Sequence, residues 1–239
     1  IGRGLGYLAG TQNRDGGWSY TSGQSNAAIT GICGMAFLAH GNVPGRGKYA
    51  RNVERAVEWM LKCGDKSGLL VGPDISHGCM YGHGFATLFL AEAYGMTGDP
   101  ELGRRIKRKL RGAVRLIAQV QLESGGWWYQ PSKMPGRTSD ISVTICQTMA
   151  LRAARTAGVN VPQKTIDKAV DCVRRAAQRD GGFAYQVPVR GRASGGSAFP
   201  RSAAGVCILY GLGQYQARET RAGVEYLLKH FKGGRYRTG

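Results

Sequence analysis

Apolar positions along the chain follow two helical patterns that alternate with each other. In one pattern apolar residues recur at helical spacing while Lys and Arg occupy the opposite face, which is typical of an amphipathic surface helix. In the other, as in residues 28–39, nearly every position is apolar, as expected for a helix buried on both sides. The first pattern predicts outer helices at about 1–12, 48–63, 100–121, 164–178 and 217–231. The second predicts inner helices at about 26–40, 82–96, 140–157 and 200–214.

These helices belong to a repeat of about fifty-five residues. The first copy consists of Arg3, Gly4, Tyr7, Leu8, Gln12, a turn at Gly16, and Trp18. Later copies place their turn at Gly68, Gly125 and Gly181, and a worn fifth copy begins near Gly223. Glycine ends a helix at little cost because it adopts left-handed backbone readily; we expect the aromatic residue to plug the turn and the glutamine to bind the loop backbone. The pattern predicts an all-α array of about four and a half helical hairpins, forming one domain over residues 1–239.

The segment from Arg3 to Trp18 resembles the QW motif of squalene and oxidosqualene cyclases. The repeat as a whole is similar to bacterial prenyltransferase/squalene oxidase repeat proteins. This resemblance implies the α/α toroid, a barrel of helical hairpins, that terpenoid cyclases share with protein prenyltransferase β subunits. It also implies an isoprenoid or similar apolar ligand in an apolar bore. Because such rings close with about six hairpins, we expect this barrel to be open or the native chain to continue beyond Gly239.

The resemblance also shows where a catalytic acid would lie. Class II cyclases protonate an alkene with the middle Asp of a DxDD motif at the start of an inner helix. The counterpart here is Asp140 followed by Ile141, Ser142 and Val143. A serine hydroxyl is far too weak an acid to protonate an alkene, so classical class II activity is not expected. Asp140 is expected to cap its helix, although Asp140 and His83 are retained as candidate catalytic residues.

Protein prenyltransferases hold a zinc ion with Asp, Cys and His side chains, and residues of these types cluster once in this sequence. The cluster consists of Asp74, His77, Cys79 and His83. Its ligand types suit zinc, but its spacing matches neither a known zinc motif nor the family's own pattern. We therefore expect no metal cofactor; if zinc binds, these four residues are the candidates. Otherwise His77 and His83 would bind loop backbone or line a pocket.

In a hairpin array all inner helices run the same way, so their N-termini should gather on one rim. That rim would attract an anion such as a diphosphate or a lipid head group, with the ligand's tail in the bore. The predicted ligand-binding residues are His77, Tyr81, His83, Phe85, Asp140, Ser142, Thr144 and Arg201. The alternative is that these residues only cap their helices.

Charge supports a second hypothesis, a non-catalytic scaffold that binds an anionic partner or a membrane surface through basic outer helices. The chain has 33 Lys and Arg against 15 Asp and Glu, a net charge of +18, and its densest basic run is residues 104–111. No nucleic-acid motif is present and no aromatic residues interleave with that run, which argues against sequence-specific recognition of nucleic acid.

The cysteines and the hydropathy indicate the compartment. Six cysteines form no CxxC pair, and several lie in apolar helical stretches, a pattern that suits a reducing environment. No run of eighteen apolar residues could span a membrane. We therefore expect a cytoplasmic protein, with peripheral membrane association as a possibility that its charge allows. The oligomeric state is left open.

Overall fold

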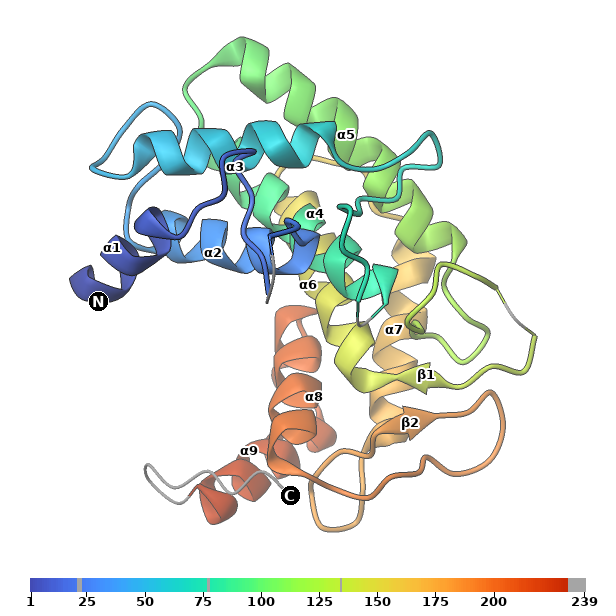
Figure 1. Cartoon of the computed structure of the whole chain (residues 1–239). Helices are drawn as coiled ribbons and strands as arrows, with labels where there is room; N and C mark the ends of the chain where they lie inside the picture. The colour runs from blue at the N-terminus through green and yellow to red at the C-terminus, as the bar shows by residue number, and fades with distance from the viewer. Residues whose placement is uncertain (21–22, 77, 134, 232–239) are drawn as a thin grey trace. The chain divides into compact units, whose positions relative to one another are not determined.

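A computed structural model describes residues 1–20, 23–76, 78–133 and 135–231. This part of the chain contains nine helices and one two-stranded sheet (Figure 1). The outer helices are α1 (Gly2–Gly10), α3 (Ala50–Lys62), α5 (Pro100–Gln119), α7 (Gln163–Ala176) and α9 (Arg218–His230). The inner helices are α2 (Ala27–Ala39), α4 (Cys79–Met96), α6 (Ile141–Thr156) and α8 (Phe199–Gly211). The predicted all-α class is confirmed, and every helix end lies within three residues of its expected position.

Two helix ends differ from the prediction by a full three residues, each for a local reason. Helix α4 begins at Cys79 rather than residue 82, because its first turn is anchored by a hydrogen bond from the Met80 amide to the Tyr129 carbonyl. Helix α8 ends at Gly211 rather than residue 214, where Gly213 turns the chain with a positive φ of 82°. None of the helices in the described ranges is long and apolar enough to cross a membrane.

The chain divides into two compact units. The first contains Ile1–Gln121, Tyr129–Ser132 and Cys146–Gln163; the second contains Leu122–Trp128, Lys133–Ile145 and Lys164–Gly239. The second unit holds the sheet, in which β1 (Ser139–Asp140) pairs antiparallel with β2 (Gln186–Val187). Strands of two residues have no alternating pattern to reveal them, so the sequence did not predict this pair.

Small residues allow the inner helices of the first unit to pack closely. A β-carbon built on Gly31 of α2 would lie 2.7 Å from the Phe85 carbonyl oxygen of α4, and one on Gly34 would lie 2.4 Å from the Phe89 ring. Phe37 and Phe89 are fully buried beside these contacts. Helix α2 therefore packs against α4 through its glycines, which explains a helix that is apolar nearly all round.

Each glycine turn contacts the backbone of the following outer helix. A β-carbon on Gly16, where φ is +102°, would lie 2.5 Å from the carbonyl oxygen of Arg55 in α3. The corresponding turns at Gly68, Gly125 and Gly181 approach the carbonyls of Gly112, Lys168 and Ala222 in the same way. Gln12 binds the loop backbone as predicted and also joins the first turn to α3. Its amide donates to the Gly16 carbonyl at 2.8 Å and to the Asn52 carbonyl at 2.9 Å.

Three of these four turns, those at Gly16, Gly125 and Gly181, are followed by an aromatic residue that is buried and held by an inner helix. Trp18, Trp127 and Phe183 are at most 3% exposed. Their backbone amides donate to the side-chain oxygens of Thr30, Thr144 and Ser202, at distances of 2.9, 3.2 and 3.0 Å in that order. These hydroxyl groups, which lie in the first turns of α2, α6 and α8, therefore join each turn to the inner helix that follows it.

Candidate functional site

A cavity of about 120 Å³ lies at the N-terminal ends of α2 and α4, within the first unit. Its walls are mostly apolar or aromatic and include Tyr20, Ala28, Ile29, Val71, Ile75 and Tyr81. Residues at the starts of both inner helices line this cavity. Tyr20 and Ile75 are more than half exposed, so they form the mouth rather than the floor.

The polar side chains at the cavity are engaged in holding its wall. Asn26 caps α2 by accepting hydrogen bonds from the amides of Ala28 and Ile29 at 2.9 and 3.2 Å. Its own amide group donates to the backbone carbonyl and to a carboxylate oxygen of Asp74, both at 3.2 Å. The other Asp74 oxygen accepts from the Ser76 amide at 2.9 Å. Asn26 and Asp74 thus fix the loop that precedes α4 against the start of α2.

The first turn of α4 forms the other wall. The Cys79 thiol donates to the side-chain carbonyl of Gln130 at 3.4 Å. The rings of Tyr81 and Tyr129 are tilted against each other with centroids 5.7 Å apart. Tyr81 is half-buried and lines the cavity, whereas Phe85, one turn further along α4, is half-buried outside its lining.

His83 is buried beneath this region and bonds only to backbone. Its Nδ1 accepts from the Leu70 amide at 2.9 Å, so the proton lies on Nε2, which donates to the Ala113 carbonyl at 3.3 Å. Burial lowers the pKa of His83 to about 4, so the ring is neutral near pH 7. Both ring nitrogens are occupied, which corresponds to the backbone-binding alternative considered for this residue.

The candidate zinc cluster is only partly described. His77 lies outside the described residues, so the structure places Asp74, Cys79 and His83. No three His, Cys, Asp or Glu side chains come together as metal ligands in the described ranges. Because both nitrogens of His83 are hydrogen-bonded to backbone, neither can bind a metal ion in this conformation. The zinc candidates therefore rest on the sequence.

The remaining predicted residues belong to the second unit and do not line the cavity. A carboxylate oxygen of Asp140 accepts hydrogen bonds from the amide and hydroxyl of Ser142, the amide at 2.8 Å, which is the geometry of a helix N-cap. The Thr144 hydroxyl donates to the Asp140 carbonyl at 2.7 Å. Arg201 donates to the Gly195 carbonyl at 2.7 Å, and its guanidinium lies over the Tyr185 ring. Each of these contacts stabilises a helix start or an adjoining loop.

Sequence reasoning missed most of the cavity lining. Of the six lining residues named above, only Tyr81 was predicted. Tyr20 and the loop residues Val71 and Ile75 carry no periodic signal, because they lie between helices. The available signal was the presence of large apolar side chains in loops on either side of α2, where polar residues are more usual.

No protein-family model and no curated protein matches this sequence, but solved structures do. A sugar epimerase from a ruminal bacterium matches with a TM-score of 0.64 at 12% identity, covering 96% of this chain and 69% of its own. Cellobiose 2-epimerase from Bacillus thermoamylovorans matches with a TM-score of 0.63 at 11% identity, covering 87% and 60%. The type II terpene cyclase MstE from Scytonema matches with a TM-score of 0.57 at 18% identity, covering 96% and 62%.

The fold of this chain is therefore that of the α/α-toroid proteins, as the resemblance of its repeats to those of squalene cyclases implied. Terpene cyclases and sugar epimerases both have this fold, so the likeness defines an architecture that serves more than one chemistry. The chain spans about three fifths of the length of the cyclase and of the cellobiose epimerase.

Proposed function

We propose that this protein binds an isoprenoid or a similar apolar molecule, and that one end of the ligand enters the cavity between the starts of α2 and α4. The observation that carries this proposal is the apolar lining of that cavity by Ile29, Val71, Ile75 and Tyr81. Its volume of about 120 Å³ is close to the roughly 150 Å³ of an engineered apolar cavity that binds benzene. It suits a single five-carbon unit or ring of a longer molecule.

The polar contacts at the cavity favour an apolar ligand over a sugar. A sugar requires several donors and acceptors that converge on its hydroxyl groups. The amide of Asn26 and the carboxylate of Asp74 are already bonded to each other and to backbone. Enclosing a five-carbon unit would contribute roughly 4 kcal/mol of hydrophobic free energy, much of which offsets the cost of association.

The proposed activity is binding without class II cyclisation. The resemblance to the DxDD motif aligns Ser142 with the proton donor of class II cyclases, and the Asp140 carboxylate accepts hydrogen bonds in the manner of a helix cap. The cyclase MstE, which has the same fold, has been solved with geranylgeranyl dihydroxybenzoate and with merosterolic acid A. This likeness supports isoprenoids as the first compounds to test.

Filling the cavity should weaken binding. Ala28 lines the cavity and Ile32, one turn further along α2, is 46% exposed and lies outside its lining. With farnesol as the probe, we expect Ala28→Phe to weaken binding at least about tenfold, a loss of roughly 1.4 kcal/mol. Ile32→Phe should bind like the wild type. Isothermal titration calorimetry of each variant with farnesol measures both.

Two results would count against the proposal. If Ala28→Phe and Ile32→Phe bound farnesol equally well, the ligand would not occupy this cavity. If the wild type bound cellobiose but not farnesol, the likeness to the sugar epimerases would be the functional one.

A further inference from the structure

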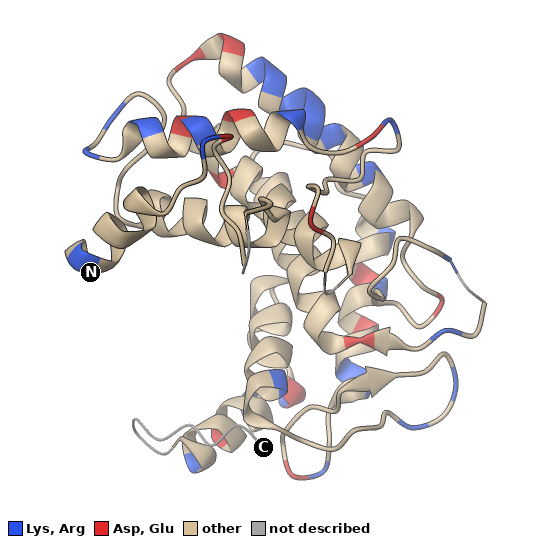
Figure 2. Ribbon diagram, in the orientation of Figure 1, with Lys and Arg blue, Asp and Glu red and all other residues tan. Residues whose placement is uncertain are grey.

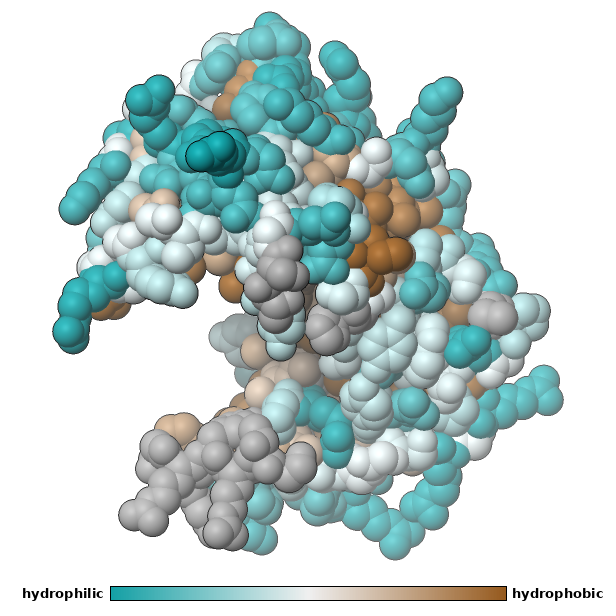
Figure 3. Space-filling view, in the orientation of Figure 1, coloured by the Kyte–Doolittle hydropathy of each residue, from teal (hydrophilic) through white to brown (hydrophobic). Residues whose placement is uncertain are grey.

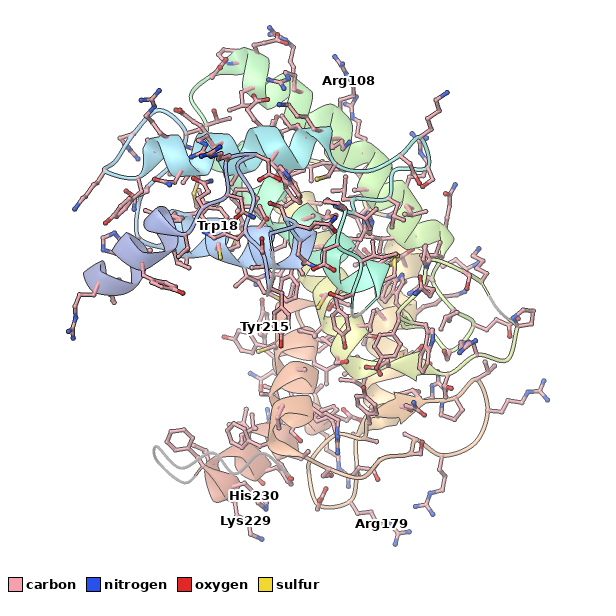
Figure 4. All side chains as sticks on the ribbon, in the orientation of Figure 1. Trp18, Arg108, Arg179, Tyr215, Lys229 and His230 are labelled. Atoms are coloured by element: carbon pink, nitrogen blue, oxygen red, sulfur yellow. The ribbon has the colours of Figure 1, made fainter. Side chains whose placement is uncertain are left out.

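Helix α5 exposes a row of arginines. Along its 20 residues, the exposed positions after the first turn are Arg104, Arg108, Arg111, Arg115 and Gln119. The spacing of four, three and four residues places the four arginines on one face of the helix, and they span about 16 Å at 1.5 Å per residue. Figure 2 shows that Lys and Arg are concentrated along α5, and Arg108 projects away from the protein in Figure 4.

Most of this charge is not neutralised within the protein. Arg104 pairs with Glu101, and Arg105 pairs with Glu58 of α3 through two hydrogen bonds of 2.6 and 2.7 Å. Among the ion pairs of the described ranges, none includes Arg108, Arg111 or Arg115. Together α3 and α5 carry ten Lys and Arg against three Glu. Most of the cations therefore have no acidic counterpart on these two helices.

The basic surface is two helices wide. Helix α3 packs beside α5, and its exposed cations are Arg51, Arg55 and Lys62. The apolar faces of both helices are buried in the core, with Val53, Val57, Ile106 and Leu110 fully buried. The space-filling view is accordingly hydrophilic over α3 and the first half of α5, whereas a hydrophobic patch is visible beside the second half of α5 (Figure 3). A partner would thus meet a preformed surface that is mainly cationic.

We propose that the exposed face of α3 and α5, defined by Arg51, Lys62, Arg108, Arg111 and Arg115, docks this protein on an anionic phospholipid surface. A single-stranded polyanion would follow one row of cations, whereas a lipid surface is wide enough to contact both of these neighbouring helices. Guanidinium groups bind phosphate with two parallel hydrogen bonds. Each basic residue held near an anionic membrane contributes about fivefold in affinity, and salt screens the attraction. This surface is separate from the cavity, so either proposal can fail without the other.

The test uses vesicles made of equal parts phosphatidylserine and phosphatidylcholine, with pure phosphatidylcholine vesicles as the neutral comparison. The wild type should co-sediment with the anionic vesicles at low salt and be released near 1 M salt, where the screening length is about 3 Å. The triple variant R108Q/R111Q/R115Q should bind about a hundredfold more weakly. Because all three side chains are exposed, its circular dichroism and thermal midpoint should match those of the wild type.

The matched control removes the same charge elsewhere. Lys164, Lys168 and Arg179 are exposed cations of the second unit. We expect K164Q/K168Q/R179Q to retain binding within a few fold. An equal loss in both triple variants would show that net charge alone drives binding and would overturn the proposal. Equal binding to neutral vesicles, or tighter salt-sensitive binding to duplex DNA than to anionic vesicles, would overturn it as well.

Discussion

Replacing Gly125 with alanine should destabilise the protein by about 3–5 kcal/mol. Gly125 has a φ of +94°, where an alanine is strained by roughly 1–2 kcal/mol. Its β-carbon would also lie 2.2 Å from the carbonyl oxygen of Lys168 and 3.0 Å from the β-carbon of Cys172, both in α7. Backbone cannot yield as a flexible side chain can, so the turn would have to separate from α7. This would disturb the hydrogen bond from Arg175 to the Ser124 carbonyl. Urea unfolding of the two proteins measures the difference.

Substitution of a second glycine distinguishes the cost of backbone strain from the cost of a close contact at the β-carbon. Gly136 belongs to the same unit and has a φ of +71°, but a β-carbon there would meet no atom within 4 Å. Gly136→Ala should therefore cost only the strain, about 1 kcal/mol. If Gly125→Ala were no worse than Gly136→Ala, the close approach of turn to helix would not stabilise this fold. The repeat of turns against outer helices would then lose its physical explanation.

The sequence predicted the helices well because two different hydrophobic patterns, one periodic and one continuous, indicated them. The outer helices α3, α5 and α7 are strongly amphipathic, and the inner helix α2 is apolar nearly all round. These patterns reflect burial on one side or on both sides, which depends on the class of each residue rather than on its exact partners. The turn glycines could be predicted for a similar reason, since positive φ restricts the choice of residue.

The candidate site was harder to predict because it depends on contacts between segments distant in sequence. Asn26 donates a hydrogen bond to Asp74, 48 residues further along the chain. The Leu70 amide donates to His83 because the intervening loop brings the two residues together. The predicted rim contained Tyr81, which lines the cavity, and His83, which lies buried beside backbone. From residue types alone a histidine near a helix start is equally suited to a ligand site and to a buried hydrogen bond. Only the packing around it distinguishes the two.

That packing makes the stability of the protein depend on pH through His83. Burial is the main cause that lowers its pKa from 6.5 to about 4, against the opposing influences of the Ala113 carbonyl and of Asp65. Between these two values the unfolded chain binds a proton that the folded chain does not. The free energy of unfolding therefore falls as the pH is lowered through this window. Between about pH 7 and pH 5 the loss from this residue should be about 2 kcal/mol.

The variant His83→Asn isolates this contribution, because asparagine does not titrate and its carbonyl can still accept from the Leu70 amide. We expect it to cost about 1–3 kcal/mol near pH 7, since the Ala113 carbonyl loses its donor in a buried site. On acidification, however, its free energy of unfolding should fall less steeply than that of the wild type, by about 2 kcal/mol over the same interval. Urea unfolding across this range measures both slopes. Parallel slopes for the two proteins would mean that His83 takes up its proton while folded. The neutral imidazole, hydrogen-bonded at both nitrogens, would then not be what holds α4 to the loop at Leu70 and to α5.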